Sequence, residues 1–473
     1  MKTVALSGGL PTTLCELTGA NGSGGTWSRD NVILYGAINR GPIRRVAASG
    51  GDCAVVTTLD TNSRETSHIY PFFLPDGRHF LYLATTQSNG VPSAGGIFVA
   101  SLDSSEHTLI VREGVNPKYA NGHLVYTRDR TLFAQPFDAK RLVLSGDPVP
   151  LSDDLQLGGQ NGFSLGAFSV ADTGTLAYLA GAAAPFELRW FDRAGRRLGS
   201  LGEPGNYADV ALAPDGARAT VTVTDSARFR NDVWIYDIAR GLRRRFTDES
   251  ASGTSAIWSF DGSRVMFRSA RRGLGDLYQR ASMGNVGEEL WLGDATDKFP
   301  VSWSPQGQVL YQVVGRDTGS DLWMVPLQGD RTPVSFRHTG FNETDGTFSP
   351  DGRWVAYVSD ESGRLEIYVA PSDGTGEPML VSPGSGPRWR RDGSELFFWA
   401  GNRLTAANLS VKGTTLEVGV LAPLFEQRHR ENRGASYDVS ADGQRFLVNT
   451  PAEEPTPIML LINWPALLTK AKP

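Results

Sequence analysis

Short runs of alternating apolar and polar residues recur along the chain, and each run ends in a tight-turn sequence. In the clearest unit, residues 354–358 and 365–369 alternate, and residues 379–381 form a further apolar run. Alternation with a period of two is typical of a strand that buries one face of a sheet. The strand before residue 354 ends in Ser-Pro-Asp-Gly, where Pro presets the turn, Asp caps it and Gly takes the left-handed conformation. The unit therefore predicts four antiparallel strands.

The same unit returns along the whole chain, with a spacing of about 45 residues between turns. The turn acids are Asp30, Asp76, Asp215, Asp261, Asp351, Asp392 and Asp442, with Asn121 and Gln306 in equivalent positions. A repeat of this length with four short strands is typical of β-propeller blades. We expect an all-β fold of about ten blades with almost no helix, since no long apolar pattern of helical period lies between the units.

An aromatic residue stands three positions before most of the turn residues. One large side chain per blade at the same register is what packing between neighbouring blades requires. We therefore assign these residues to the core rather than to a cofactor or a sugar: Trp27, Phe73, Trp258, Trp303, Phe348 and Trp389.

Ten blades exceed the four to eight of a usual ring, so we expect two propellers in tandem. The run of small residues at 181–185 is the predicted joint. It separates an N-terminal part, 1–185, with about four blades and a start within a blade, from a six-bladed ring at 186–473. The border stays open, because residues 186–201 could instead complete the blade that starts near Phe168. The unit at Asp442 also needs a strand from elsewhere to complete its sheet.

Residues 349–363, Ser-Pro-Asp-Gly-Arg-Trp-Val-Ala-Tyr-Val-Ser-Asp-Glu-Ser-Gly, resemble the repeats of TolB-like, WD40-like propellers. Nearly the whole chain also resembles the C-terminal repeat region of bacterial receptor-type serine/threonine protein kinases. The stretches that carry this likeness are residues 65–82, 126–150, 191–195, 387–393 and 437–450.

The resemblance implies a kinase domain, a membrane helix and two more blades upstream, and a periplasmic or extracytoplasmic location. The chain itself contains no Gly-rich loop before a strand lysine, no His-Arg-Asp and no Asp-Phe-Gly. We therefore expect no kinase activity from these residues.

The composition of the chain limits the kinds of partner that it can bind. The chain has 46 basic and 51 acidic residues and a net charge of −5, so it offers no basic field for nucleic acid. The late apolar run at 458–468 is broken by Asn463 and Pro465 and is shorter than a membrane helix. We expect a monomer with no membrane segment and no export signal.

Cys15 and Cys53 permit one bridge at most, and we expect two buried free thiols.

No motif in the chain identifies a reaction. Residues 162–166, Gly-Phe-Ser-Leu-Gly, match the hydrolase elbow pattern, but no helix signal follows them, so we expect no nucleophile there. The six histidines lack the spacing of metal pairs, and the turn acids occur once per blade, whereas Ca²⁺ needs six to eight oxygens in one place. We expect no metal and no cofactor.

The starts of the innermost strands are the most informative positions, because in propellers these strands line the channel and lead into its mouth. Polar residues lie there, six to eight positions before the turn residue or, in one blade, four: His68, Tyr207, Asp209, Lys298, Glu343, Asp345 and Arg388. We expect them to form a funnel that binds a protein or small-molecule ligand. A solvated channel mouth without a ligand would give the same pattern.

These features together predict a non-catalytic binding or sensor module rather than an enzyme. One alternative is a propeller lyase, glycosidase or peptidase, with Asp209, Glu343 and Asp345 as the carboxylates to examine. Another is a non-functional fragment of a longer protein. Function inferred from a fold alone is weak, so the site must decide between these readings.

Overall fold

The computed structural model describes residues 1–4, 12–15, 22–37, 41–88, 91–158, 165–181, 184–225, 230–248, 252–284, 286–314, 319–412, 415–430, 435–452 and 457–469. Over these ranges the chain forms 44 strands and one short helix, α1 (Pro465–Thr469), which confirms the all-β prediction. No helix in them is long and apolar enough to cross a bilayer. The serine of the elbow-like motif, Ser164, lies outside these ranges.

The chain divides into two compact units. Unit 1 comprises Met1–Ala184 and Glu454–Pro473, and unit 2 comprises Pro185–Glu453. Residues 454–473 thus belong to unit 1, whereas the sequence pattern places them in the second ring. Residues 182 and 183 of the predicted joint lie outside the described ranges. The number of blades in the whole chain and its division into two rings stay predictions.

Unit 2 contains six four-stranded antiparallel sheets among its described residues. In five of them the strands follow one another in the chain. These are β22 (Tyr207–Leu212), β23 (Arg218–Asp225), β24 (Arg230–Asp237) and β25 (Leu242–Arg245); β26 (Thr254–Trp258), β27 (Arg264–Ser269), β28 (Asp276–Ala281) and β29 (Glu289–Leu292); β30 (Asp297–Trp303), β31 (Gln308–Val314), β32 (Ser320–Pro326) and β33 (Val334–Arg337); β34 (Glu343–Phe348), β35 (Trp354–Ser359), β36 (Glu366–Pro371) and β37 (Met379–Pro383); and β38 (Ser385–Trp389), β39 (Glu395–Ala400), β40 (Arg403–Lys412) and β41 (Thr415–Glu426).

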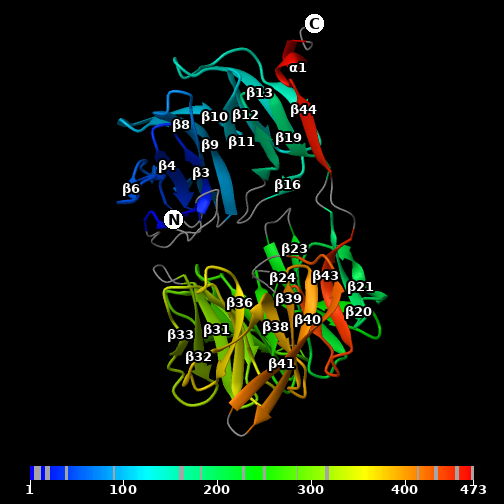
Figure 1. The fold of residues 1–473 in the computed structure, drawn as a ribbon. Coiled ribbons are helices and arrows are strands. Elements are labelled where there is room, and N and C mark those ends of the chain that lie inside the picture. Colours follow the sequence, from blue (N-terminus) through cyan, green and yellow to red (C-terminus); the bar gives the residue numbers. More distant parts are fainter. Residues whose placement is uncertain are drawn as a thin grey trace. The chain divides into compact units, whose positions relative to one another are not determined.

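The sixth sheet joins the two ends of unit 2. Its order is β21 (Arg197–Gly205), β20 (Phe186–Asp192), β43 (Arg445–Pro451) and β42 (Tyr437–Val439). In Figure 1, β20 and β21 (green) lie beside β43 (orange-red), although they are far apart in the sequence. The first two strands therefore complete the sheet of the Asp442 unit and not that of Phe168. The six innermost strands contact one another in cyclic order, from β22 through β26, β30, β34 and β38 to β42 and back to β22.

The Ser-Pro-Asp-Gly turn is held by its own side chains. The Ser349 hydroxyl donates to Asp351 Oδ1 at 2.6 Å and accepts from the Trp354 N–H at 3.0 Å. The Arg353 N–H also donates to Asp351 Oδ1, at 3.1 Å. Gly352 adopts a φ of 72°, which a residue without Cβ reaches at no steric cost. The turn acid is thus a local cap.

The aromatic residues before the turns pack between neighbouring blades. Trp258 is buried against Val233 and Ile235 of the preceding blade, and its indole N–H donates to the Ala211 carbonyl at 3.1 Å. The indole of Trp389 donates to a carbonyl of the preceding blade in the same way. Trp27 in unit 1 is an exception, because 56% of its surface is exposed.

Unit 1 contains blades of the same kind. Its described strands are β1 (Lys2–Thr3) and β2 (Thr12–Thr13); β3 (Gly22–Trp27), β4 (Val32–Ala37), β5 (Arg44–Ala47) and β6 (Ala54–Val55); β7 (Glu65–Phe73), β8 (His79–Ser88), β9 (Val91–Ser101) and β10 (Ser104–Val111); β11 (Val115–Ala120), β12 (His123–Arg128), β13 (Thr131–Asp138), β14 (Val143–Leu144) and β15 (Val149–Ser152); β16 (Leu157–Gly158) and β17 (Leu165–Gly166); and β18 (Phe168–Val170), β19 (Thr175–Leu179) and β44 (Ile458–Ile462).

The strand β44 pairs with β19, from Thr175 opposite Ile462 to Leu179 opposite Ile458. The sequence pattern assigns this strand to the second ring because it follows the Asp442 unit. In the structure β20 already occupies the edge of β43, so β44 pairs elsewhere. The adjoining Trp464 is fully buried in the same cluster as Leu176, which fixes β44 to unit 1.

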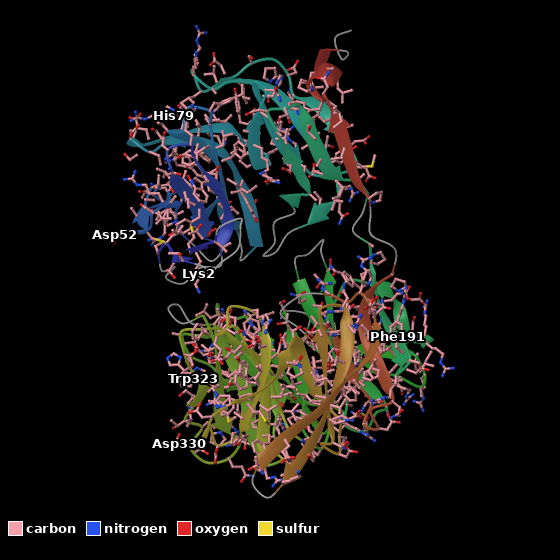
Figure 2. The ribbon with its side chains drawn as sticks, in the orientation of Figure 1. Lys2, Asp52, His79, Phe191, Trp323 and Asp330 are labelled. Atoms are coloured by element: carbon pink, nitrogen blue, oxygen red, sulfur yellow. A yellow bond between two sulfur atoms is a disulfide. The ribbon has the colours of Figure 1, made fainter. Side chains whose placement is uncertain are left out.

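Cys15 and Cys53 form a disulfide, so the prediction of two free thiols is wrong. Their Cα atoms are 6.0 Å apart, within the range that a disulfide bridges. Cys15 lies in an apolar cluster with Tyr35 and Val46, and Cys53 packs against this cluster, which brings the end of the first hairpin beside the segment before β6. In Figure 2 the labelled Asp52 precedes Cys53 and marks this place. A contact between residues 38 positions apart leaves no local signal in the sequence.

Candidate ligand-binding channel of unit 2

A cavity of about 600 Å³ lies among the innermost strands of unit 2. All six strands contribute to its wall, so it is the central channel of the ring. Its volume is within the range of small-molecule sites in proteins. Charged residues in the wall include Asp209, Asp345, Arg388, Arg391 and Asp438.

The innermost strands bulge at a common register, six positions before the turn residue. Ser255, Asp345 and Gly386 stand there with φ values of 54°, 53° and 62°. The pairing register of each strand shifts around these residues. A bulge adds one unpaired residue and bends the strand, and it redirects the side chains on either side.

Asp345, Arg388 and Asp438 form a charged cluster in the channel wall. Arg388 Nε lies 4.0 Å from Asp438 Oδ1, and its Nη1 donates to the Pro387 carbonyl at 2.7 Å. Burial raises the pKa of Asp345, and the Arg388 guanidinium opposes that shift. Burial raises the pKa of Asp438 as well, again against the field of Arg388. One guanidinium thus lies near two partly buried carboxylates.

Asp209 lies at the bulge of the first innermost strand and is buried. Its Oδ1 accepts from the Thr222 hydroxyl at 2.7 Å, and its Oδ2 accepts from the Ser255 N–H of the next blade at 3.1 Å. Burial raises the pKa of Asp209, and the positive charge of Arg430 lowers it in part. Both oxygens of this carboxylate therefore already have partners.

The three channel acids share one pattern, because each accepts a backbone N–H from the following innermost strand. Asp209 bonds Ser255, Asp345 bonds Gly386, and Asp438 bonds Leu212. These bonds cross from blade to blade. The acids therefore hold the ring together as well as giving the channel its charge.

The other four predicted residues do not line this cavity. They all lie eight positions before their turn residue, ahead of the bulge, and all are 0–2% exposed: His68, Tyr207, Lys298 and Glu343. Ahead of the bulge the strand directs these side chains into the blades. Only the predicted residues six or four positions before the turn line the channel.

Each of these four has a structural partner. Lys298 Nζ donates to Asp294 at 2.5 Å, and the Tyr207 hydroxyl donates to the Glu203 carbonyl. Glu343 accepts from the Thr339 hydroxyl. His68 lies in unit 1, where its ring nitrogens bond Thr57 and Glu65 at 2.7 and 3.0 Å. These contacts hold the four side chains within the fold, outside the lining of the cavity.

Two channel features escaped the sequence prediction. Asp438 stands four positions before its turn acid, as Arg388 does, so the register itself could have revealed it. The second feature is a collar around the turn end of the cavity. It consists of the residue directly before each turn residue in the six blades: Pro214, Phe260, Pro305, Pro350, Arg391 and Ala441.

In the described part of the chain, no three His, Cys, Asp or Glu side chains are grouped as a metal ion would require. The channel acids illustrate the reason, because their oxygens are used by backbone N–H groups and by arginine.

No family model matches the chain. Over 198 residues it is 25% identical to the uncharacterized peptidase YuxL of Bacillus subtilis (strain 168), a match that covers 38% of this chain and 28% of the relative. Over 144 residues it is 26% identical to the Tol-Pal system protein TolB of Anaeromyxobacter sp. (strain K), covering 30% of this chain and 32% of the relative. The chain thus spans less than a third of the length of the curated relatives it matches.

Among solved structures, TolB from Acinetobacter baumannii aligns with a TM-score of 0.38 and 15% sequence identity, over 66% of this chain and 79% of that one. The fold follows from the chain's own sheets: blade after blade ends its innermost strand in a Pro-Asp-Gly-like turn, and in unit 2 six sheets enclose a channel. With these blades and with repeats similar to those of TolB, the chain is a TolB-like β-propeller protein.

Proposed function

We propose that the chain is a non-catalytic binding module whose unit 2 channel holds a segment of a partner protein or a small molecule. The observation that carries this proposal is the cluster of Asp345, Arg388 and Asp438 in the wall of the cavity. A few fixed charged groups in a largely preformed cavity give a ligand its orientation and specificity. The closed ring of blades keeps these groups in place without a ligand.

The bonding of the channel acids supports binding rather than proton transfer. Asp209 and Asp438 each accept two hydrogen bonds within the fold, including one from a neighbouring blade. A general acid or base needs a carboxyl group that reaches the reacting atom. Asp345 is the channel acid with more acceptor capacity left, since a backbone N–H of Gly386 and the charge of Arg388 are its partners.

A propeller hydrolase or lyase is the second candidate. Burial raises the pKa of Asp345 and of Asp438, and shifted carboxyl groups in a cavity are common in active sites. The relative that is named a peptidase fits this reading. Turnover of a peptide or oligosaccharide by the full chain, abolished in Asp345→Asn, would favour it over the binding module.

The setting that we propose is extracytoplasmic. The Cys15–Cys53 disulfide supports it, because disulfides persist in oxidising compartments. The TolB relative is named as a protein of the Tol-Pal system, which supports a protein partner for this chain as well.

Affinity selection tests the proposal. The full chain is equilibrated with a mixed library of short peptides, amines and oligosaccharides, and bound compounds are identified by mass spectrometry. The channel variants Asp345→Asn and Arg388→Gln should lower the affinity for the selected compound about 10- to 100-fold, as expected when a charge-assisted hydrogen bond is lost.

The matched control is Asp373→Asn, which changes an exposed acid in the turn after β36, outside the channel. It should bind as the native chain does. Unchanged affinity in both channel variants, with an intact fold, would place the ligand elsewhere and refute the proposal.

A further inference from the structure

The collar at the turn end of the channel contains a single charged residue. Five of its six members are Pro, Phe or Ala, and the sixth is Arg391, in the turn after β38. The exposed Arg391 therefore places a cation beside apolar side chains at this end of the cavity, which the turn acids Asp215 and Asp442 also line.

The side chain of Arg391 reaches across the channel. Its Nη1 donates to the Pro214 carbonyl at 2.8 Å, and its guanidinium lies over the Phe260 ring, with Cζ 5.6 Å from the ring centre. Pro214 follows β22 and Phe260 follows β26. In the cyclic order of the blades, β26 is the third strand from β38 in either direction and therefore stands opposite it. Arg391 thus lies across the turn end of the cavity.

The charge of Arg391 has no acidic partner among the described residues. Its neighbours in the turns are engaged elsewhere: Asp215 pairs with Arg218 at 2.8 Å, and Asp392 pairs with Arg390 at 3.2 Å. A guanidinium carries five N–H donors in a fork that matches a carboxylate, and the described hydrogen bonds use one of them. The remaining donors are available at the end of the cavity.

We propose that Arg391 binds the terminal carboxylate of a peptide that lies in the unit 2 channel. This rests on the proposed function and names the class of its ligand. Asp345 lines the same cavity and stands six positions before its turn acid, whereas Arg391 stands one position before its own. Five residues of strand correspond to about 17 Å, which is the length of about five residues of extended peptide.

The same chemistry is offered by a free short peptide and by the C-terminal tail of a larger protein. A free peptide of this length brings its amino group near Asp345, whereas a tail continues past it. Acetylation of the amino group separates the two sources. It removes the positive charge at the amino end of a free peptide, whereas the C-terminal tail of a larger protein carries no amino group at that position.

The test uses penta-alanine as the probe and isothermal titration calorimetry on the full chain. Three forms of the probe are compared: free termini, C-terminal amide, and N-acetylated. The native chain should bind the amide about 10- to 100-fold more weakly than the free acid, as expected for a lost charge-assisted pair. In Arg391→Gln, acid and amide should bind alike, at the affinity of the amide. Arg391→Lys should restore part of the preference for the acid.

The control is Arg240→Gln, which removes another exposed arginine, 76% exposed, outside the collar. It should bind like the native chain, and thermal melts of the native chain and the arginine variants should coincide because Arg391 and Arg240 are both exposed. A preference for the acid that persists in Arg391→Gln would overturn the proposal, as would a native chain that binds none of the three probes. If both forms bind equally to the native chain and Asp345→Asn weakens both, the channel function stands and the role of Arg391 falls.

Discussion

The Oδ2 atom of Asp438 accepts a hydrogen bond from the backbone N–H of Leu212 at 2.7 Å, although the two residues are 226 positions apart. Asp438 belongs to the last innermost strand of unit 2 and Leu212 to the first. The Val210 N–H adds a second bond across the same junction, to the Ala435 carbonyl at 3.1 Å. The ring is therefore closed by side-chain and backbone bonds as well as by the shared sixth sheet.

Replacing Asp438 should loosen this junction. Asp438→Ala leaves the part-buried Leu212 N–H without its acceptor, which costs about 1 kcal/mol, near the lower end of the range for an unsatisfied buried donor. We expect urea denaturation, monitored by tryptophan fluorescence, to show that the free energy of unfolding of unit 2 falls by this amount. Asp438→Asn keeps an amide oxygen as acceptor and should lose less. An alanine variant as stable as the native chain would show that the bond does not secure the ring.

Glu343 should make unit 2 less stable as the pH rises. Burial raises the pKa of Glu343, and the nearby Asp321 carboxylate raises it further. An acid whose pKa is raised by folding contributes stability below its unfolded pKa, and that contribution is lost as the pH rises through the folded pKa. Glu343→Gln removes the titration and keeps a similar shape.

The free energy of unfolding of Glu343→Gln should therefore exceed that of the native chain at pH 8. The difference should vanish below the ordinary glutamate pKa of 4.5. Glu377→Gln, in the exposed turn before β37, serves as the control. A difference that is constant between pH 4 and pH 8 would contradict the prediction.

Reduction of the Cys15–Cys53 disulfide should destabilise unit 1 alone. Loss of a disulfide that closes a loop of this size lowers the free energy of unfolding by about 2–4 kcal/mol, chiefly because the unfolded chain gains conformational entropy. Dithiothreitol should lower the melting temperature of unit 1, and Cys53→Ser should reproduce the effect and remove the response to the reductant. Non-reducing peptide mapping reports the bridge directly. Identical melts with and without dithiothreitol would show that the bridge does not contribute to stability.

Truncation after residue 453 tests the assignment of β44. We expect residues 185–453 to melt cooperatively alone, because their sixth sheet is complete without the last twenty residues. Removing residues 454–473 from the full chain should lower the stability of unit 1, since Leu176 loses the cover of Trp464. A truncated chain in which only unit 2 is destabilised would reverse the assignment.

The sequence predicted the blades well because their signals are local. Each Pro-Asp-Gly turn and each alternating strand, such as residues 354–358, is specified within a few residues. The pairing of β20 with β43 and the Cys15–Cys53 bridge depend on residues far apart in the chain, and local patterns do not reveal such contacts. Those parts of the fold could be identified only from the structure.

The candidate site was predicted in part, and the bulge explains which part. Polar residues eight positions before the turn, such as Lys298 and Glu343, lie ahead of the bulge and are buried. Asp345 and Arg388 lie at or after it and line the channel. A shift of one residue moves a side chain to the other face of a strand, and the position of the bulge cannot be read from apolar alternation alone.

The division of unit 1 into two stretches has a consequence for biosynthesis. The ribosome completes residues 1–184 first, and then the whole of unit 2, before it delivers the strand that pairs with β19. Throughout that interval β19 has an open edge in the nascent chain, and Leu176 lacks the indole of Trp464 as cover. An unpaired edge of this kind is a site for aggregation and for chaperone capture during translation. Unit 1 is therefore completed by a strand that is synthesised only after the whole of unit 2.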